Sequence, residues 1–416
     1  MDLTYSPDDR AFRSRTRAWF ERHRPRPLET LEDRRAWHRT LYEGGYVGMG
    51  WPREFGGQDA RPLEQAIVAE EIARANVPGT INGLGIGIVG PTLIAHGTEN
   101  QKRRYLRKIL AAEELWCQLY SEPDAGSDLA SLKTTARREG DGYVVNGQKV
   151  WTSQAAIANF GVLLARTDAS VAKHAGISYF VLDMHAPGVE VRPLTQITGS
   201  ADFSEVFFTD VRVPAENLIG DEGQGWTLAQ TTLGFERGGN LLARVTRHRS
   251  VLQQLIVAAG HLRPDGTPAL EQSLVRQKLG QMFAELEVLR YAGLRALSRL
   301  EKGQRPGPES SVDKLYYSEM DKRHHELIQE ILGPYGQLTE GLASELTLDT
   351  TTSLGVPADW TYSYLYSRAG TIYAGSSEIQ KNIIGERVLG LPREPRADRV
   401  APTTARSNGS ATGKGA

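Results

Sequence analysis

Residues 117–154 contain the side chains most able to do chemistry. SEPDAGSD (121–128) is a turn-rich loop in which small residues lie between acids and hydroxyls. YVVNGQKVW follows, and its Asn146-Gly147 pair predicts a hairpin turn between two strands. The second run ends at Trp151, beside two hydroxyl residues. A flat indole next to donors suits a planar ligand such as a flavin, although a tryptophan in a strand is more often a core residue.

Composition narrows the class of protein. The chain has 416 residues, enough for two or three domains, and 49 basic residues nearly balance 50 acidic ones, so nothing favours a nucleic-acid partner. The single cysteine, Cys117, excludes a disulfide framework and a cysteine-rich metal site, and we expect it to be a buried thiol. The N-terminus lacks a secretory pattern, and the longest apolar stretch, Gly83–Ala95, is too short to insert into a membrane. We therefore expect a cytoplasmic protein.

The periodicity of apolar residues changes twice along the chain. It predicts a helical N-terminal domain (1–114), a middle β-domain that forms a small barrel or sandwich (115–224), and a C-terminal helical bundle (225–395). The bundle is expected to include a helix near 338–353. The last residues, 396–416, have the composition of a disordered tail. The predicted fold class is therefore α+β.

SEPDAGSD followed by KVWTS resembles the signature of the acyl-CoA dehydrogenase family, flavoenzymes that desaturate acyl thioesters. The similarity runs from Leu41 to Pro392. It implies the three-part architecture and FAD as cofactor, with flavin N5 accepting hydride. The chemistry agrees, because desaturation needs a base, a hydride acceptor that no side chain supplies, and a group that stabilises the carbonyl oxygen.

The resemblance also assigns flavin contacts to the central stretch. Ser121 and Ser153 would bond the ring system, Trp151 would pack against it, and Ser127 would meet ligand phosphates or pantetheine. The complete set of matching positions is Gln118, Tyr120, Ser121, Gly126, Ser127, Trp151 and Ser153.

The general base departs from the common family pattern. Many members carry a glutamate after a tyrosine near the C-terminus, and here that position is Ala374. A minority, similar to isovaleryl-CoA dehydrogenase, carry it in a Glu-Arg pair on an earlier helix, which matches Glu236-Arg237. The resemblance thus implies Glu236 as base and Arg237 as a substrate contact. The alternative is a surface glutamate paired with an arginine. Ala374 would retain the N–H that binds the thioester carbonyl, with Gly375 beside it.

The adenine end of FAD is matched less closely. Arg263 and Gln277 match residues that bind the diphosphate and adenine across a dimer. Gly333 lies in a matching glycine motif, preceded by Glu330 where a glutamine is usual. Two further matches are Ser376 and Glu378, of which we interpret Glu378 mainly as an acid that complements a helix dipole.

No metal site is expected, because His324 and His325 are adjacent, without partner ligands, and are interpreted as surface histidines. The resemblance implies an acyl-CoA substrate, an electron-transfer flavoprotein as acceptor and a homo-oligomer (dimer or homotetramer). Two alternatives stay open. The chain could be a catalytically degenerate partner subunit of a hetero-tetramer, or a flavin monooxygenase or oxidase on the same fold.

Overall fold

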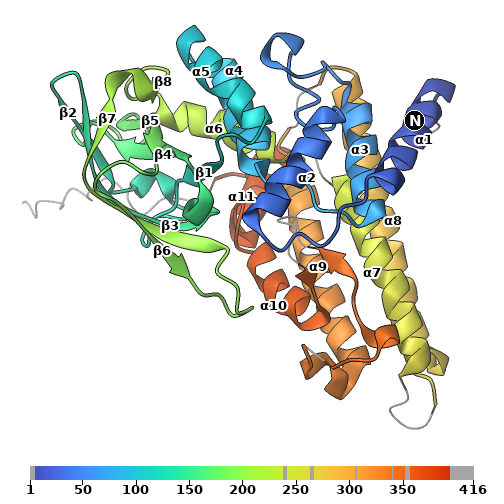
Figure 1. Cartoon of the computed structure of the whole chain (residues 1–416). Coiled ribbons are helices and arrows are strands. Elements are labelled where there is room, and N and C mark those ends of the chain that lie inside the picture. Colours follow the sequence, from blue (N-terminus) through green and yellow to red (C-terminus); the bar gives the residue numbers. More distant parts are fainter. Residues whose placement is uncertain are drawn as a thin grey trace, which may run out of the picture.

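The computed structural model of the chain gives helices, then a β-rich block, then helices again (Figure 1). This is the predicted α+β architecture. The predicted tail, 396–416, lies outside the described residues. Backbone is described for residues 5–237, 241–262, 267–304, 307–339, 341–351 and 357–393, and side chains for the same residues except 233–237, 351 and 357.

The N-terminal block consists of helices, three of which have a side-chain cap at the N-terminus. Ser6 begins the first helix and accepts the N–H of Asp9 at 3.1 Å, while the Asp9 carboxylate accepts from the Ser6 backbone and hydroxyl. Gly90 lies against the Trp51 ring, so the GLGIGIVG segment serves helix packing. The helices are α1 (Pro7–Arg22), α2 (Leu31–Glu43), α3 (Pro62–Ala75), the π-helix η2 (Gly85–Val89), α4 (Gly90–His96) and α5 (Glu99–Leu110).

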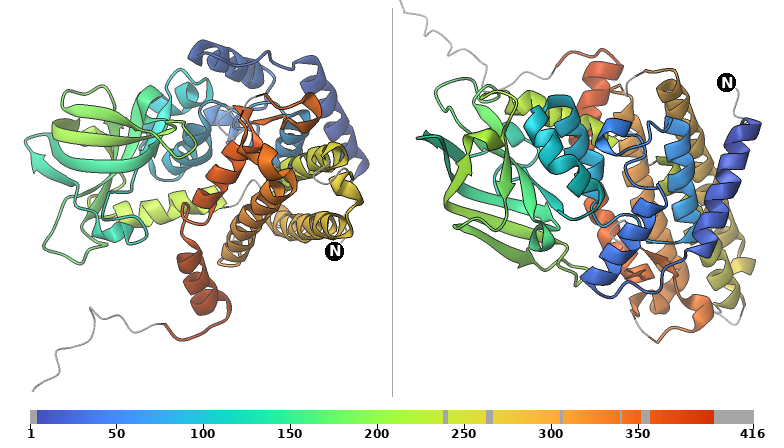
Figure 2. Two further views of the ribbon diagram at one scale, coloured as in Figure 1. Left: turned by 90° about the horizontal axis from the view of Figure 1, so that it is seen from below. Right: turned by 45° about the horizontal axis from the view of Figure 1, so that its top comes forward.

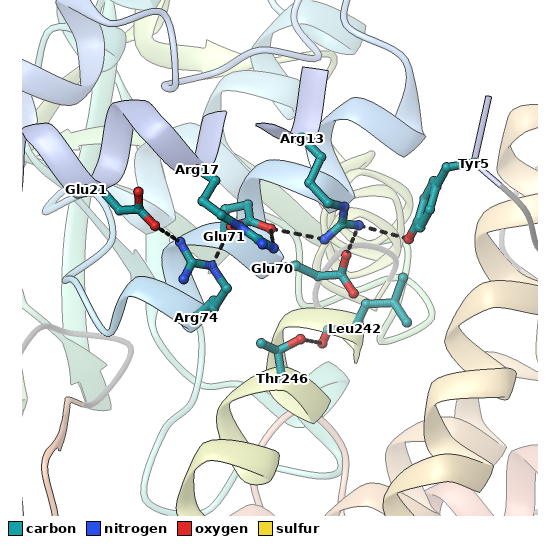
Figure 3. A network of polar contacts seen from close by, with 9 residues as sticks. All are labelled: Tyr5, Arg13, Arg17, Glu21, Glu70, Glu71, Arg74, Leu242 and Thr246. Atoms are coloured by element: carbon teal, nitrogen blue, oxygen red, sulfur yellow. Dashed lines mark hydrogen bonds and ion pairs between the residues drawn. The ribbon is translucent and has the colours of Figure 1, made fainter. Parts of the chain in front are cut away.

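An arginine–glutamate network fastens α1 to α3 (Figure 3). The Glu71 side chain is 1% exposed and accepts from Arg17 at 2.9 Å and Arg74 at 2.7 Å. Burial opposes the charge of Glu71, but the hydrogen bonds from Arg17 and Arg74 outweigh it and lower its pKa. Arg13 adds bonds to Glu71 and Glu70. Arg13 and Arg17 of α1 therefore hold the two helices together through Glu70 and Glu71 of α3.

The β-rich block is a single sheet in the order β6-β7-β3-β2-β4-β5-β8, with β1 parallel to β4. Both faces of β4 and β5 are buried, because one faces the N-terminal helices and the other the interior of the block. Cys117 is buried in β1, as expected. The strands are β1 (Trp116–Leu119), β2 (Thr135–Glu139), β3 (Gly142–Ser153), β4 (Phe160–Arg166), β5 (Ile177–Asp183), β6 (Val189–Leu194), β7 (Phe203–Pro214) and β8 (Leu218–Ile219).

The hairpin predicted at Asn146-Gly147 is wrong. β3 continues through both residues, and its register with β7 shifts there as a β-bulge. The Asn146 side chain bonds across the ladder to Asp210, donating at 3.0 Å and accepting its N–H at 2.9 Å. Gly147 has φ of 148°, and a Cβ there would lie 2.5 Å from the Thr134 hydroxyl. Because of these long-range contacts, the Asn146-Gly147 dipeptide forms a bulge in one continuous strand and not a turn between two strands.

The C-terminal block is a helical bundle, and α6 reaches toward it from the strands (Figures 1 and 2). In Figure 1, α11 lies between the β-rich block and the other C-terminal helices. None of the helices in the described ranges is long and apolar enough to cross a membrane. The helices are α6 (Gly225–Arg237), α7 (Leu241–His261), α8 (Ser273–Glu301), α9 (Ser310–Leu332), α10 (Trp360–Gly370), α11 (Ser377–Ile383) and the π-helix η9 (Ile384–Val388).

The helix predicted near 338–353 is not found in the described part of that range, residues 338–339 and 341–351. Its described part holds one short 3-10 turn, η8 (Ser344–Leu346), and β9 (Thr350–Thr351), which pairs with β10 (Pro357–Ala358). The Asp349 N–H donates to Gln254 of α7 at 2.7 Å. Such tertiary bonds, in a threonine-rich stretch of low helix propensity, replace the helical ladder.

The expectation that His324 and His325 lie on the surface is also wrong, because they are 3% and 8% exposed. His325 and His248 both meet the Asp321 carboxylate, at 3.2 and 2.7 Å. Burial opposes a charge on His325, but the Asp321 carboxylate outweighs it and raises the pKa of His325. His324 bonds Glu285 at 2.8 Å. The two histidines therefore join α7, α8 and α9 through buried polar contacts.

Candidate active site

A buried ion pair shapes the SEPDAGSD loop. The Glu122 carboxylate accepts from Lys149 Nζ at 2.8 Å and from the N–H groups of Lys133 and Thr134 at 2.6 and 3.0 Å. Lys149 also donates to the Tyr120 carbonyl at 3.0 Å. The Lys149 side chain is 0% exposed. This buried ion pair therefore fixes the SEPDAGSD loop to β3.

Burial and mutual attraction act in opposite directions on the two members of this pair. Burial lowers the pKa of Lys149 to about 8, against the opposing pull of Glu122. Burial would raise the pKa of Glu122, but Lys149 and the backbone donors outweigh it and lower the pKa. Nothing in the sequence indicates this pair, since Lys149 in a strand resembles a solvated residue and its partner lies far away in sequence.

The structure brings the two predicted halves of the flavin site together. The Val150 N–H donates to the Ser121 carbonyl at 2.9 Å, so the end of β3 lies beside the loop that follows β1. Tyr120 is buried, with its hydroxyl 2.8 Å from that of Tyr179. Ser121 and Ser153 are half-buried at this edge of the sheet.

Trp151 is the most exposed part of this edge. Its φ is 58°, in the left-handed region, and its side chain is 61% exposed. Its ring meets that of Phe203 edge to face, with centroids 6.1 Å apart. The indole face is thus presented outward and is not a core residue. Gly126 and Ser127 are also exposed, at the tip of the neighbouring loop.

A second turn, residues 373–376, lies between α10 and α11. Ala374 and Gly375 have φ of 53° and 87°. Lys314 of α9 donates to the Gly375 carbonyl at 2.7 Å. Gln380 of α11 donates to the carbonyls of Ala374 and Gly375 at 3.2 and 3.1 Å. The backbone of this turn is therefore fixed without any contribution from the side chain at position 374.

A small cavity of about 90 Å³ adjoins Ala374. Leu241 and Arg244 of α7 line it, together with Asp313 and Tyr317 of α9. Burial raises the pKa of Asp313, against the opposing charge of Arg295 on α8. The role of these residues in lining the cavity could not be predicted, because no sequence motif indicates a cavity between two helices.

The predicted base lies at the C-terminal end of α6. The backbone of Glu236 and Arg237 forms the last turn of that helix, and their side chains lie outside the described residues. Helix α7 begins shortly after, at Leu241, which lines the cavity beside Ala374. Arg263 also lies outside the described residues.

The other predicted cofactor residues fall into two groups. Ser376 caps α11, and Glu378 is exposed in its first turn. Gln277, Glu330 and Gly333 are exposed where α8 begins and α9 ends, joined by an ion pair of Lys278 with Glu330 at 2.5 Å. No hydrogen bond or ion pair within the described ranges links this second group to the SEPDAGSD loop.

Comparison with known proteins decides the family. Family models of acyl-CoA dehydrogenases match in order along the chain: the N-terminal domain over residues 6–113, the middle domain over 117–211 and the C-terminal domain over 223–389. The acyl-CoA dehydrogenase IpdE1 of Mycobacterium tuberculosis is 42% identical over 371 residues, which are 89% of this chain and 91% of the relative. The chain belongs to the acyl-CoA dehydrogenase family.

Solved structures agree with this assignment. The acyl-CoA dehydrogenase fold matches a structure titled Tcur3481-Tcur3483 steroid ACAD with a TM-score of 0.80 and 30% identity, covering 95% of this chain and 100% of that one. It also matches the ChsE4-ChsE5 complex of M. tuberculosis with a TM-score of 0.79 and 31% identity, over the same shares. As an acyl-CoA dehydrogenase, the protein is an oxidoreductase that acts on acyl-CoA.

Members of this family are FAD-dependent flavoproteins, and the residues present fit that cofactor. Gln118 Nε2 is buried and has no hydrogen-bond partner in the described part of the chain. It belongs to β1, which leads into the loop beside the outward-facing Trp151 indole. A ring ligand with polar edges would satisfy the amide and cover the indole. Gln118, Tyr120, Ser121, Trp151 and Ser153 would hold it.

Proposed function

We propose that this acyl-CoA dehydrogenase desaturates its substrate between Cα and Cβ, with Glu236 removing the α-proton. FAD, when bound, supplies the hydride acceptor, which is N5 in this family. One observation carries the proposal: the chain keeps both turns of the site in ordered form, while the usual carboxylate position holds Ala374. The base must then come from another element, and Glu236 matches the alternative family position.

The position of Glu236 supports this role. It ends α6, directly before the helix whose first residue, Leu241, lines the cavity at Ala374. A carboxylate there would lie between apolar acyl and ring surfaces, which raise a carboxyl pKa and suit it to proton abstraction. Arg237 would contact the substrate beside it. The Ala374 N–H, with Gly375 next to it, would bind the thioester carbonyl, and Ser127 the pantetheine or phosphates.

The adenine end of FAD would be completed by a second subunit. Gln277, Glu330 and Gly333 lie together on an exposed surface, apart from the loop that would hold the ring. This separation supports a dimer or larger assembly in which Arg263 and these residues, with Ser376 and Glu378 at the α11 end, reach a neighbour's cofactor. An electron-transfer flavoprotein would reoxidise the enzyme.

The substrate class is proposed from relatives. One structural neighbour is titled a steroid ACAD, at 30% identity. A base that reaches in from α6 leaves the space at Ala374 to the ligand, and the cavity there is about 90 Å³. We infer that the acyl group is bulky, with a branch or ring, and derives from a lipid or steroid.

Anaerobic titration of the purified protein with acyl-CoAs, from short straight chains to steroid side chains, tests the proposal by the loss of flavin absorbance. Glu236→Gln should abolish rapid flavin reduction, since a general base contributes about 10²–10⁴ in rate. Glu113→Gln, an exposed glutamate of the N-terminal block, is the matched control. Undiminished reduction in Glu236→Gln rejects that base, and reduction by short straight chains alone rejects the bulky substrate.

A second candidate rests on Ala374 itself. The chain could be a degenerate partner subunit in a hetero-tetramer, supporting an active homologue as in complexes of two different chains. In that case the protein expressed alone would bind no flavin, or would bind flavin that acyl-CoA does not bleach. Oxygen consumption without an electron carrier would instead identify an oxidase or monooxygenase.

A further inference from the structure

The turn at residues 373–376 offers N–H groups without acceptors. The flanking amides are used: Tyr373 donates to the Ala369 carbonyl at 3.0 Å and Ser377 to that of Thr371 at 2.9 Å. Among the described residues, none accepts from the N–H of Ala374, Gly375 or Ser376. All three residues are partly buried, and enclosed amides without acceptors are costly. These donors therefore point to a ligand.

The carbonyls of the same turn are held firmly. Gln380, 1% exposed, donates to the carbonyls of Ala374 and Gly375, and Lys314 donates to that of Gly375. No peptide bond in the described ranges is cis. In a trans peptide the carbonyl points opposite to the next N–H, so fixing the Ala374 carbonyl aims the Gly375 N–H the other way. The side chains behind the turn thereby set the direction of its donors.

The charge of the lysine adds to this geometry. A hydrogen bond from an ammonium group to the Gly375 carbonyl polarises the peptide that joins Gly375 to Ser376, and a polarised peptide donates more strongly through its N–H, here that of Ser376. It also places a positive charge behind the position where negative charge develops on a thioester oxygen. A neutral side chain of equal length would keep the packing and lose both effects.

We propose that Lys314 and Gln380 are positioning residues for the dehydrogenation: they hold the carbonyls of Ala374 and Gly375 so that the turn's N–H groups bind and polarise the thioester carbonyl. This rests on the proposed function, because it takes an acyl-CoA thioester as the ligand of the turn. It explains how the site stays ordered with alanine at position 374. Binding of the thioester at the turn then depends on its backbone and on two side chains, Lys314 of α9 and Gln380 of α11.

The experiment measures carbonyl polarisation directly, without turnover. The full-length holoenzyme is titrated with a ring-conjugated enoyl-CoA labelled with carbon-13 at the thioester carbonyl, and the labelled stretch is followed by infrared difference spectroscopy. In wild type the stretch should move to lower frequency on binding. Lys314→Met should reverse most of that shift and weaken binding about tenfold. Lys314→Arg should restore part of it, and Gln380→Leu should have a smaller effect of the same sign.

Lys322→Met is the matched control, since Lys322 lies on the same helix and pairs with Glu319 at 3.1 Å on the surface. It should leave the shift and the affinity unchanged. A merely structural role for Lys314 would lower the melting temperature and leave the carbonyl frequency of bound ligand at its wild-type value, which overturns the proposal. Absence of any shift in wild type overturns it as well.

Two further measurements distinguish failure of the positioning role from failure of the proposed dehydrogenation. If Lys314→Met does not fold, Lys314→Arg and Gln380→Leu decide, and an unchanged frequency in both rejects the positioning role. Glu236→Gln should lose flavin reduction by saturated acyl-CoA yet keep the full carbonyl shift. A wild-type protein that shifts the carbonyl but is never reduced would reject the proposed dehydrogenation while supporting this inference.

Discussion

The two turns of the site, 121–128 and 373–376, are held in different ways. The first depends on one buried ion pair, Glu122 with Lys149, whose carboxylate also accepts two backbone N–H groups. The second depends on donors from α9 and α11 that meet backbone carbonyls. A turn built on side-chain charge tolerates no change at its charged positions. A turn built on its backbone can lose the side chain at position 374 and keep its shape.

The largest effect is expected at the ion pair. Lys149→Met leaves the Glu122 carboxylate buried without its partner, which should cost about 3–5 kcal/mol and release FAD. Denaturant unfolding and flavin content check this. Lys133→Met is the control from the same loop, because Lys133 is 76% exposed in its surface pair with Asp124 and should matter little. Equal losses in the two variants would remove the distinction between buried and surface charge.

The contact of His325 with Asp321 on α9 tests whether a buried charge also stabilises the helices that hold the turn at 373–376. His325→Gln removes one partner of Asp321 and should cost about 3 kcal/mol at acidic pH. Because the pKa of His325 is raised in the fold, its contribution is complete below the ordinary value of about 6.5 and is lost as pH rises through the folded pKa. The stability gap between wild type and variant should therefore narrow with rising pH.

Unfolding series from pH 5.5 to about 9 measure that gap. His185→Gln, an exposed histidine of the β-rich block, should show no such narrowing. A gap that widens with pH would mean that His325 is neutral in the fold.

One glycine in each turn gives a direct comparison. Gly375 has φ of 87°, and a Cβ there would lie 2.4 Å from Gln380 Nε2, so Gly375→Ala should cost about 1–3 kcal/mol and weaken acyl-CoA binding. Gly126 in the other turn faces open space, with nothing within 4 Å of an added Cβ. Gly126→Ala should change stability by less than about 0.5 kcal/mol. Thermal melts and ligand titration measure these effects. If the turn at 373–376 were loose, Gly375→Ala would have a smaller effect than Gly126→Ala.

The smallest structural effect is expected from Ala374→Glu. Position 374 already holds a residue with a Cβ at positive φ, and a cavity of about 90 Å³ adjoins it. We expect a stability change within about 0.5 kcal/mol. In a Glu236→Gln background the new carboxylate should recover at least about tenfold of the lost flavin reduction. No recovery in a well-folded double variant would show that the turn no longer faces the substrate Cα.

The sequence predicted the features that rest on local patterns. The three-part α+β order is confirmed. The family resemblance is also confirmed, because it rests on the SEPDAGSD motif, whose residues are contiguous in the sequence. Glu236 stays a prediction, since its side chain lies outside the described residues.

The misses have a common physical cause. Asn146-Gly147 carries a strong local turn preference, yet cross-strand bonds to Asp210 make it a bulge. Lys149 and His325 carry polar side chains that local reasoning places in water. Their burial depends on partners distant in the chain, Glu122 and an Asp321 shared with His248. Pairings of this kind become visible only when the fold is known.

The outward indole of Trp151 has a practical consequence. Of the seven tryptophans, Trp116 and Trp360 are almost wholly enclosed, while Trp151 is 61% exposed at the flavin edge. Its fluorescence should be emitted at long wavelength in the apoprotein and be quenched as a cofactor ring covers it. The chain thus contains its own optical reporter, and a Trp151→Phe variant would isolate that signal from the enclosed indoles.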